Sequence, residues 1–241
     1  MSRPPTGTPI AGAVALVTAG NRGLGRALVD ELLERGATKV YATSRSSQRR
    51  RDERIVPLVL DVTDDASVAA TARAASDVSI VVNNAGVQLG TPVLDAPLDD
   101  IRSELETNLF GTIRVARAFA PILASHSSSA MVNVLSVLSW LALGRGYEIS
   151  EAAAWSATNS MRLQLRGQGT VVTALYVGCM DRDVTAGVHI PEADPRDVAR
   201  QAADAIVAGT FEVLSDDVTR FVKSQLSRDV TALYGQLLAA A

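Results

Sequence analysis

The chain has 241 residues, a length that fits one α/β domain, and 47% of them are hydrophobic while 20% are charged, as in a globular protein with a sizeable core. A net charge of −3 argues against bulk attraction to nucleic acid or an acidic membrane, and no run approaches the roughly 18 apolar residues of a membrane span. The one cysteine, Cys179, cannot form an internal disulfide, which favours a reducing compartment. We therefore expect a cytoplasmic protein with no nucleic-acid or membrane partner.

The first predicted elements are a strand, a glycine-rich turn and a helix. Residues 1–10 are rich in proline and are expected to form a flexible tail before a single domain over residues 11–241. A buried strand over 14–17 runs into a turn that holds Gly20, Gly23 and Gly25, and a helix follows over 26–34. Such a turn lets a phosphate approach the backbone, where free N–H groups at the helix start can bind it. The alternative is a tight turn without a ligand.

The remaining elements alternate between strands and helices. Strands are predicted over 38–43, 56–60, 78–82, 130–135 and 171–176, and helices over 65–76, 98–120, 147–165, 195–208 and 217–238. The strands are nearly continuous apolar runs, which is typical of a parallel sheet covered by helices on both faces. In a doubly wound sheet of this kind, ligands bind beyond the carboxyl ends of the strands.

A basic residue follows the second predicted strand. Arg45 lies twenty residues after Gly25, at the place where a site for NAD carries an acidic residue that binds the ribose 2′-hydroxyl. An arginine suits a 2′-phosphate instead, so we expect NADP(H) in preference to NAD(H). Arg22, inside the turn, would add a second positive contact. The alternative is that Arg45 is a solvated loop charge, since other arginines follow it.

Several short motifs follow the predicted strands in a specific order. They are Thr18 with the glycine turn, Asp61-Val62, Asn83-Asn84-Ala85-Gly86, Asn108, Ser136 and Tyr147. With these motifs the chain resembles the short-chain dehydrogenase/reductase family, whose members are single-domain Rossmann enzymes, over about residues 11–230.

The resemblance implies a cofactor site, a catalytic site and self-association. It assigns the pyrophosphate to the turn, through Thr18, Gly20, Asn21, Arg22, Gly23 and Leu24. It assigns the adenine to the end of the third strand, through Asp61 and Val62. It assigns the middle of the cofactor to the end of the fourth strand, through Asn83, Ala85 and Gly86. Ser136 would bind a substrate carbonyl, Tyr147 would exchange the hydroxyl proton, and Asn108 would hold a relay water at a break in its helix. Structural roles are the alternatives, such as a helix cap at Asp61. The family pairs through its long fourth and fifth helices, so a homodimer or homotetramer is expected.

The main departure from the family pattern lies four residues after the tyrosine. The family has Tyr-x-x-x-Lys on a helix, where the spacing puts both side chains on one face, and this chain has Tyr147 followed by Glu151. The family lysine lowers the pKa of the tyrosine and binds the nicotinamide ribose. A carboxylate raises that pKa instead, and each unit costs about tenfold in the tyrosinate form. Ordinary hydride chemistry should therefore be impaired unless another group compensates.

Other departures surround the same place. Ala19 stands where the family has its first glycine, which costs little unless the position needs a positive φ. Ser136 precedes Tyr147 by eleven residues, where the family usually has thirteen, so the intervening loop is short. The expected substrate pocket holds Ser139, Trp140, Gly178, Cys179 and Arg182, and Arg182 is a candidate replacement for the lost cation.

Three functions remain open on the sequence. The first is an NADP(H)-dependent carbonyl or alcohol oxidoreductase with an altered active site. The second is a non-redox cyclase, dehydratase, isomerase or lyase on the same fold, with Tyr147 as acid and Glu151 as base. The third is a pseudoenzyme that keeps the cofactor as structure. The departures also leave open that cofactor binding is weakened or lost. No cluster has the spacing of a metal site.

Overall fold

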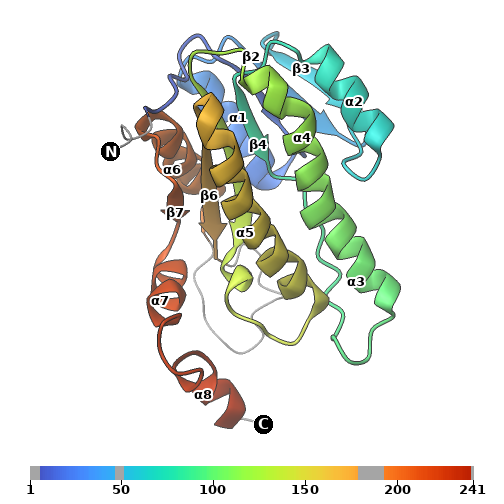
Figure 1. The fold of residues 1–241 in the computed structure, drawn as a ribbon, viewed down its shortest axis with the longest axis vertical. Helices are drawn as coiled ribbons and strands as arrows, with labels where there is room; N and C mark the ends of the chain where they lie inside the picture. The colour runs from blue at the N-terminus through green and yellow to red at the C-terminus, as the bar shows by residue number, and fades with distance from the viewer. Residues whose placement is uncertain (1–5, 47–51, 179–192, 240–241) are drawn as a thin grey trace.

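The computed structural model describes residues 6–46, 52–178 and 193–239 (Figure 1). Seven strands form one parallel sheet in the order β3-β2-β1-β4-β5-β6-β7. The strands are β1 (Val14–Val17), β2 (Lys39–Ser44), β3 (Ile55–Val59), β4 (Ile80–Asn83), β5 (Ser129–Ser136), β6 (Thr170–Val177) and β7 (Glu212–Leu214). The helices are α1 (Gly23–Glu34), α2 (Asp65–Ala74), α3 (Leu98–Leu105), α4 (Thr112–Leu123), α5 (Gly146–Leu165), α6 (Pro195–Ala208), α7 (Asp217–Gln225) and α8 (Thr231–Ala239).

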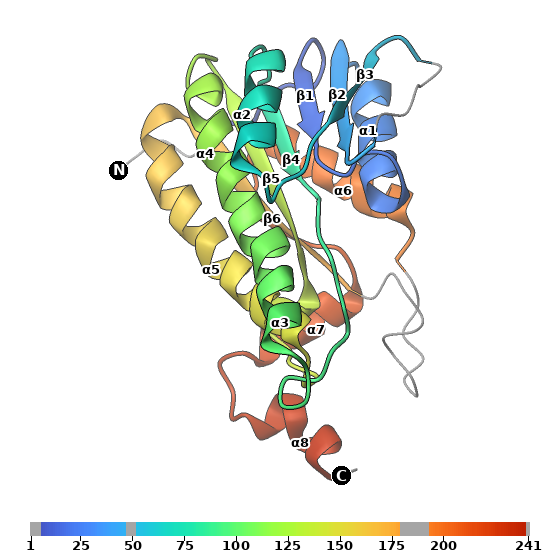
Figure 2. The same cartoon turned by 90° about the vertical axis from the view of Figure 1, so that its right-hand side faces the viewer.

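The sheet is covered on both faces, as predicted. Helices α1 and α6 lie on one face, and α2, α4 and α5 lie on the other (Figure 2). In β1 the alternation of side chains sends Ala15 and Val17 to the first layer and Leu16 to the second. Each aliphatic side chain buried in this way contributes roughly 1.5–3 kcal/mol, so the two layers fix the sheet register.

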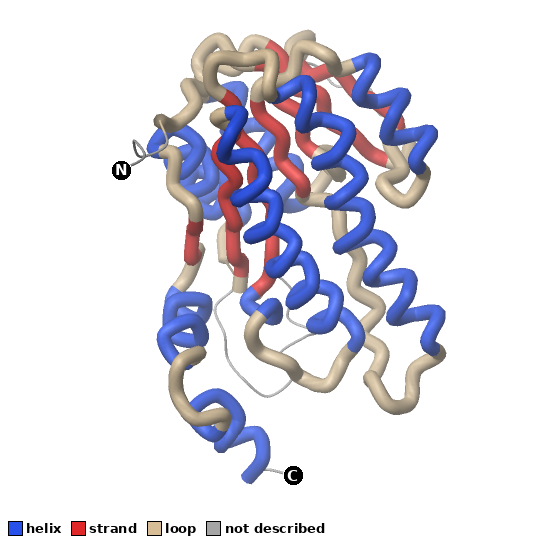
Figure 3. Tube along the Cα trace, viewed as in Figure 1, coloured by secondary structure: helices blue, strands red, loops and turns tan. Residues whose placement is uncertain are grey.

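The strand order reverses between β1 and β4, and this switch point positions the site. Ligands of doubly wound sheets bind where the chain leaves neighbouring strands in opposite directions. The turn after β1 and the segment after β4 therefore lie side by side at the carboxyl edge of the sheet. Helices α7 and α8 extend beyond that same edge (Figure 3).

Three elements differ from those predicted. The short edge strand β7 was missed, and the helix expected over 217–238 is two helices, α7 and α8. The helical region expected over 98–120 contains a π-helical segment, Glu106–Gly111, between α3 and α4. Pro57 lies in the middle of β3, which tolerates it because β3 is an edge strand.

The expected tail is corrected for its described part. Thr8 and Ile10 are buried, and the N–H of Thr8 donates to the carbonyl of Ile206 at 2.9 Å. A Cβ at Gly7 would lie 1.8 Å from the Val207 carbonyl oxygen, so the segment packs closely on α6. Residues 1–5 lie outside the described residues. Within the described ranges, no helix is both long and apolar enough to cross a membrane.

Candidate active site

The turn between β1 and α1 is built by close backbone packing. A Cβ at Gly25 would lie 2.2 Å from the Ala19 carbonyl oxygen, and one at Gly20 would come within 3.1 Å of the β1 backbone. Gly23 has a φ of +51°, and the space beside it is open. Leu24 is buried and anchors the first turn of α1, whose initial N–H groups have no partner inside the helix. The turn therefore combines open space with free donors, which is what a phosphate requires.

Ala19 occupies the strained position of this turn. It is the non-glycine residue with a positive φ among the described residues, at 51°. The left-handed region costs an L-residue about 1–2 kcal/mol. A cost was expected only if this position needs a positive φ, and the φ of Ala19 shows that it does. The next residues stay near the opening, since Asn21 is half-buried and Arg22 is exposed at the N-terminus of α1.

Hydrogen bonds to Thr18 join the ends of β1 and β4. The N–H groups of Asn84 and Ala85 both donate to Thr18 Oγ1 at 2.8 Å, and Asn84 Nδ2 donates to the Thr18 carbonyl at 3.1 Å. Thr18 is buried, so its side chain positions the two segments and does not face a ligand. Asn84, whose side chain was not a predicted site residue, holds the turn in place.

Asn83 ends β4, and its side chain turns into the core. Asn83 Nδ2 donates to Asn133 Oδ1 at 2.8 Å, and Asn133 Nδ2 donates to Thr158 Oγ1 at 3.0 Å. The side chain thus belongs to a set of hydrogen bonds between β4, β5 and α5. Strand alternation gives it this direction, so a contact of Asn83 with the cofactor stays a prediction for its backbone.

The ends of β2 and β3 place a cation beside a carboxylate. Arg45 is exposed, and Asp61 accepts hydrogen bonds from the N–H and hydroxyl of Thr63 at 2.9 and 2.7 Å. The bonds from Thr63, together with the nearby Arg45 charge, lower the pKa of Asp61. Val62 is buried and packs on the π-helical segment, where a Cβ at Gly111 would lie 2.7 Å from it. The two charged groups therefore stand together at the edge where adenosine is expected.

The start of α5 brings the acid–base residues together. Glu151 is 6% exposed, and its Oε2 accepts a hydrogen bond from the N–H of Ser136 at 2.8 Å. Ser136 Oγ accepts from the N–H of Leu138 at 3.1 Å, which leaves its proton free to be donated. Burial raises the pKa of Glu151 to about 7, although the Ser136 N–H and the Tyr147 hydroxyl favour the charged carboxylate. Glu151 is therefore a group that exchanges a proton near neutral pH.

The tyrosine of this pair holds its proton firmly. Burial raises the pKa of Tyr147 well above its ordinary value, and the charge of Glu151 raises it further. Ser136 acts in the opposite direction, since a hydrogen bond from its hydroxyl favours the tyrosinate. At neutral pH the side chain is therefore a hydrogen-bond and proton donor.

Two further carboxylates are buried near the tyrosine. Glu104, at 0% exposed, accepts a hydrogen bond from the N–H of Leu89 at 2.7 Å, and its Oε2 would lie 2.6 Å from a Cβ at Gly146. Glu148, at 3% exposed, accepts from the N–H of Arg145 at 2.6 Å, and burial raises its pKa. These carboxylates hold the loops on either side of the site and give the region an acidic character.

Asn108 forms hydrogen bonds that join the π-helical segment to the segment after β4 and to the start of α5. In the π-helical segment its Oδ1 accepts from the N–H of Val87 at 2.8 Å, and its Nδ2 donates to the Val87 carbonyl and to Ser150 Oγ, both at 2.9 Å. Ser150 Oγ in turn donates to the Tyr147 carbonyl at 2.7 Å. The Asn108 carbonyl accepts from Thr112 Oγ1 at 2.9 Å. The break in the helix thus places Asn108 between the segment after β4 and the start of α5.

A cavity of about 360 Å³ unites these groups. Of the predicted site residues, its walls include Ala85, Gly86, Asn108, Ser136, Tyr147, Glu151 and Gly178. The cavity therefore joins the segment after β4, the end of β5, the start of α5 and the end of β6.

Two predicted pocket residues lie elsewhere. Ser139 is buried and does not line the cavity, and its hydroxyl lies near Glu151 without the geometry of a hydrogen bond. Trp140 packs on Tyr176 with ring centroids 4.0 Å apart, in a cluster that includes α7. Neither side chain is among the described residues that line the cavity, because the turn after β5 directs Trp140 into this cluster and places Ser139 beside Glu151. Cys179 and Arg182 lie outside the described residues.

Two residues before and within α7 were missed. Asp216 Oδ2 accepts from the N–H of Gly178 at 2.8 Å, and Asp216 Oδ1 caps α7 by accepting from the N–H of Thr219 at 2.8 Å. Val218, two residues later, lines the cavity. Aspartate is a favoured residue at the start of a helix, but no local pattern shows that this cap lies against the end of β6.

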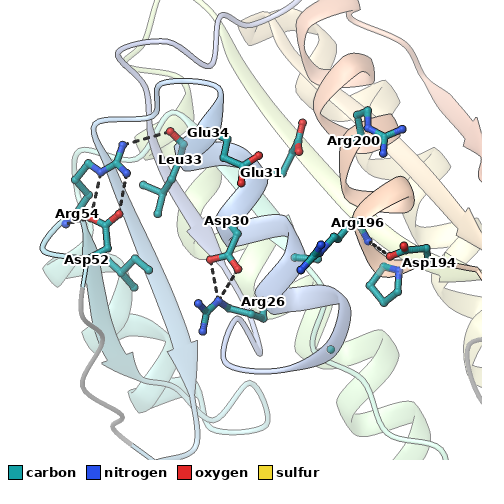
Figure 4. A pocket seen from close by; sticks show the side chains of 14 residues that line it. Arg26, Asp30, Glu31, Leu33, Glu34, Asp52, Arg54, Asp194, Arg196 and Arg200 are labelled. Carbon is teal, nitrogen blue, oxygen red and sulfur yellow. Dashed lines mark hydrogen bonds and ion pairs between the residues drawn. The ribbon is translucent and has the colours of Figure 1, made fainter.

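A second hollow lies between α1, α6 and the start of β3 (Figure 4). Its charged side chains pair with neighbours, as Arg26 does with Asp30 and Arg54 with Asp52, both at 2.7 Å. Exposed pairs of this kind are a solvated surface with little net binding energy. In the part of the chain that the structure describes, no cluster of three or more histidine, cysteine or acidic side chains could hold a metal.

The chain is similar to known dehydrogenases and reductases. Residues 13–192 match the short chain dehydrogenase family. The chain is 31% identical over 221 residues to 1-deoxy-11-beta-hydroxypentalenate dehydrogenase of Streptomyces exfoliatus, covering 84% of this chain and 80% of that protein. It is 30% identical over 189 residues to 3-oxoacyl-acyl-carrier-protein reductase FabG of Vibrio harveyi, covering 74% and 78%.

The same likeness holds among solved structures. A short chain dehydrogenase of Burkholderia cenocepacia J2315, solved in complex with NADP, superposes with a TM-score of 0.88 and 36% identity, covering 96% of this chain and 99% of that one. The sheet order and the site at its switch point define a single-domain Rossmann protein. The chain belongs to the short-chain dehydrogenase/reductase family, and its relatives' names indicate an oxidoreductase.

Proposed function

We propose that the protein is an NADP(H)-dependent carbonyl reductase in which Tyr147 donates a proton to the substrate and Glu151 replaces that proton. One observation carries the proposal: both side chains line the same cavity, beside Ala85 and Gly86. Because burial keeps the proton on Glu151 up to about pH 7, the pair holds a transferable proton under neutral conditions.

The residues at the carboxyl edge fit a dinucleotide. The open side of Gly23 and the free N–H groups of α1 suit the pyrophosphate, and Arg45 beside Asp61 suits a ribose 2′-phosphate. The related Burkholderia dehydrogenase was solved with NADP, which supports the same choice here. Ala19 keeps the turn in the required conformation at a local cost, so the site is strained and usable.

Each residue of the cavity has a distinct task in reduction. NADPH, when bound, supplies the hydride that reduces a carbonyl carbon. The Ser136 hydroxyl, whose oxygen is already held by Leu138, donates a hydrogen bond to the carbonyl oxygen. Tyr147 transfers its proton to that oxygen as the alcohol forms. Glu151 then returns a proton to the tyrosinate, whose charge it would otherwise oppose.

The pH dependence of turnover tests this assignment. Only the protonated form of Glu151 can supply a proton, so kcat/KM for ketone reduction should fall about tenfold per pH unit above about 7. The Glu151→Gln variant should be about 100-fold slower and lose this inflection. Glu148→Gln is the matched control, because Glu148 is also buried with a raised pKa but does not line the cavity. An inflection that survives in Glu151→Gln would refute the role of Glu151.

A non-redox enzyme is the second candidate. A donor with a raised pKa and a carboxyl group that titrates near neutrality are an acid–base pair that needs no hydride. The two functions differ in whether NADPH disappears as product forms. Conversion of a substrate with no loss of NADPH would favour a lyase, isomerase, cyclase or dehydratase. Binding of NADPH without any conversion would favour a pseudoenzyme.

A further inference from the structure

The walls of the cavity are mostly aliphatic. Beside the acid–base pair, the turn after β5 contributes Leu138, Leu141 and Leu143, and the segments after β4 and at the start of α7 contribute Val87 and Val218. These side chains follow β4, β5 and β7, which lie on the other side of β1 from β2 and β3 in the strand order. A substrate that fills this space gains from burying apolar surface, about 25 cal/mol per Å².

The described lining of the cavity carries no basic side chain. Among its described lining residues none is lysine, arginine or histidine, and the ionisable ones are Tyr147 and Glu151. Glu104 and Glu148 are buried close behind, the charge of Glu104 reaches the tyrosine, and the charge of Arg145 acts on Glu148 outside the lining. An anionic substrate group would lose its hydration there without gaining an opposite charge from the described lining residues, and it would face Glu151.

Helix α7 is a fixed part of this wall. Asp216 ties its start to the end of β6 through Gly178, and Val222 is buried against Trp140 and Tyr176 in one apolar cluster. Further along, the N–H of Ala142 donates to the Tyr234 hydroxyl at 2.9 Å, so α8 is joined to the turn after β5. Val218 is therefore held at the cavity from both sides, beyond the stretch that matches the family.

We propose that the cavity accepts neutral, apolar carbonyl compounds and rejects anionic ones, and that Val218 is a specificity-determining residue of its wall. This inference rests on the proposed function for the reaction. It concerns the class of substrate, which the charge and composition of the wall determine.

The first test compares three ketones that share one carbon skeleton. The probes are 2-octanone, 7-oxooctanoate and the methyl ester of that acid, each with NADPH at about pH 8, where the acid is an anion. We expect kcat/KM for the ketone and for the ester to exceed that for the keto acid by about 100-fold, because the site leaves the carboxylate unpaired. Reduction of the keto acid within tenfold of the ketone would overturn the inference.

The second test changes the wall itself. The Val218→Arg variant supplies a cation to the wall. It should raise kcat/KM for the keto acid, so that the ratio of kcat/KM between ketone and keto acid falls by about tenfold or more. Val207→Arg is the control, since Val207 is 50% exposed on α6 and does not line the cavity. A Val218→Leu variant, which only adds volume, should slow 2-octanone more than acetone. Unchanged ratios in both Val218 variants would remove this residue from the specificity wall.

A binding measurement separates failure of the inference from failure of the proposed function. The three compounds are titrated into the NADP⁺-loaded protein in a calorimeter. If none of them is reduced, the proposed reductase function fails. The inference then stands only if the ketone and ester bind at least about tenfold more tightly than the keto acid. Equal binding of all three, or binding of none, would overturn it as well.

Discussion

The turn after β1 and the start of α5 both depart from the family pattern, but the two departures act by different physics. At the turn, Ala19 adopts a conformation that glycine adopts freely, so the change adds strain to an intact backbone. At α5, Glu151 places a carboxyl group with a pKa raised to about 7 where the family has a lysine, inside a buried site. The first departure costs about 1–2 kcal/mol of backbone strain and touches no group of the acid–base pair. The second leaves the fold unchanged and, in the mechanism proposed above, changes which group supplies a proton.

The difference shows how a fold tolerates change at a functional site. The hydrogen bonds to Thr18 Oγ1 and the close packing of Gly25 hold the backbone of the turn. These contacts stabilise the turn although Ala19 is strained. The carboxylate at position 151 is accommodated because the Ser136 N–H donates to it. That hydrogen bond satisfies the oxygen but leaves the pKa of the side chain high, and the mechanism proposed above uses the resulting proton.

The largest expected effect comes from removing the proton donor. Tyr147→Phe should lower kcat for ketone reduction by about 10³-fold, because general acid catalysis is lost, while the Kd for NADPH stays within about threefold. Steady-state kinetics and calorimetry measure the two quantities. Tyr41→Phe, which removes a hydroxyl bonded to Asp77 on β2, is the control. A loss of less than tenfold would mean that another group protonates the substrate.

The second largest effect is expected when position 151 carries the lysine that the family has there. Glu151→Lys removes a charge that raises the pKa of Tyr147 and adds one that lowers it, so alcohol oxidation with NADP⁺ should increase about tenfold per unit of that shift. The gain should be largest above about pH 8, where tyrosinate begins to form. Rates measured from pH 6 to 10 test this. No gain at any pH would mean that the pocket as a whole has diverged from redox chemistry.

The nucleotide end should respond in binding alone. Arg45→Gln should raise the Kd for NADPH by about tenfold or more, as expected for the loss of a hydrogen bond to a charged group, and should leave the Kd for NADH unchanged. Calorimetric titration with each nucleotide measures this. Arg102→Gln, an exposed arginine paired with Asp99 on α3, is the control. Equal weakening of both nucleotides would contradict a role for Arg45 in reading the 2′-phosphate.

The smallest effect is expected at the strained turn. Ala19→Gly should raise the free energy of unfolding by about 0.5–1 kcal/mol, because relief of the left-handed conformation exceeds the added entropy of the unfolded chain. Ala70→Gly, at an exposed position of α2, should lower it by about 1 kcal/mol. Urea denaturation measures both. A loss of stability in Ala19→Gly would show that the strain is not at this residue.

Much of the fold could be predicted from the sequence, because long apolar strands and amphipathic helices depend on local pattern. The helix over 195–208 and the buried strands illustrate this. The short edge strand β7 could not be predicted, since three half-buried residues carry too little periodicity. A break in the helix at Asn108 was expected from the family resemblance, but its π-helical form could not be predicted, because it depends on how Asn108 bonds to the segment after β4.

The site was predicted where motifs follow strands and missed where distant segments meet. Ser136, Tyr147 and Glu151 share the cavity because strand end and helix start are neighbours in the fold. The bond of the Asn83 side chain to Asn133 could not be predicted, because the direction of a side chain at a strand end depends on register. Val218 lies some forty residues beyond the end of β6, and only the Asp216 contact with that strand brings it to the cavity.

An infrared titration tests most directly whether the buried carboxyl group of Glu151 keeps its proton up to about pH 7. The carboxyl band of a buried protonated glutamate is resolved by subtracting spectra of Glu151→Gln from those of the unchanged protein across the pH range. We predict that this band disappears with a midpoint at about pH 7. A midpoint at about pH 4.3, the ordinary pKa of a glutamate, would show that Glu151 is a charged carboxylate at neutral pH and would contradict the proposed proton transfer.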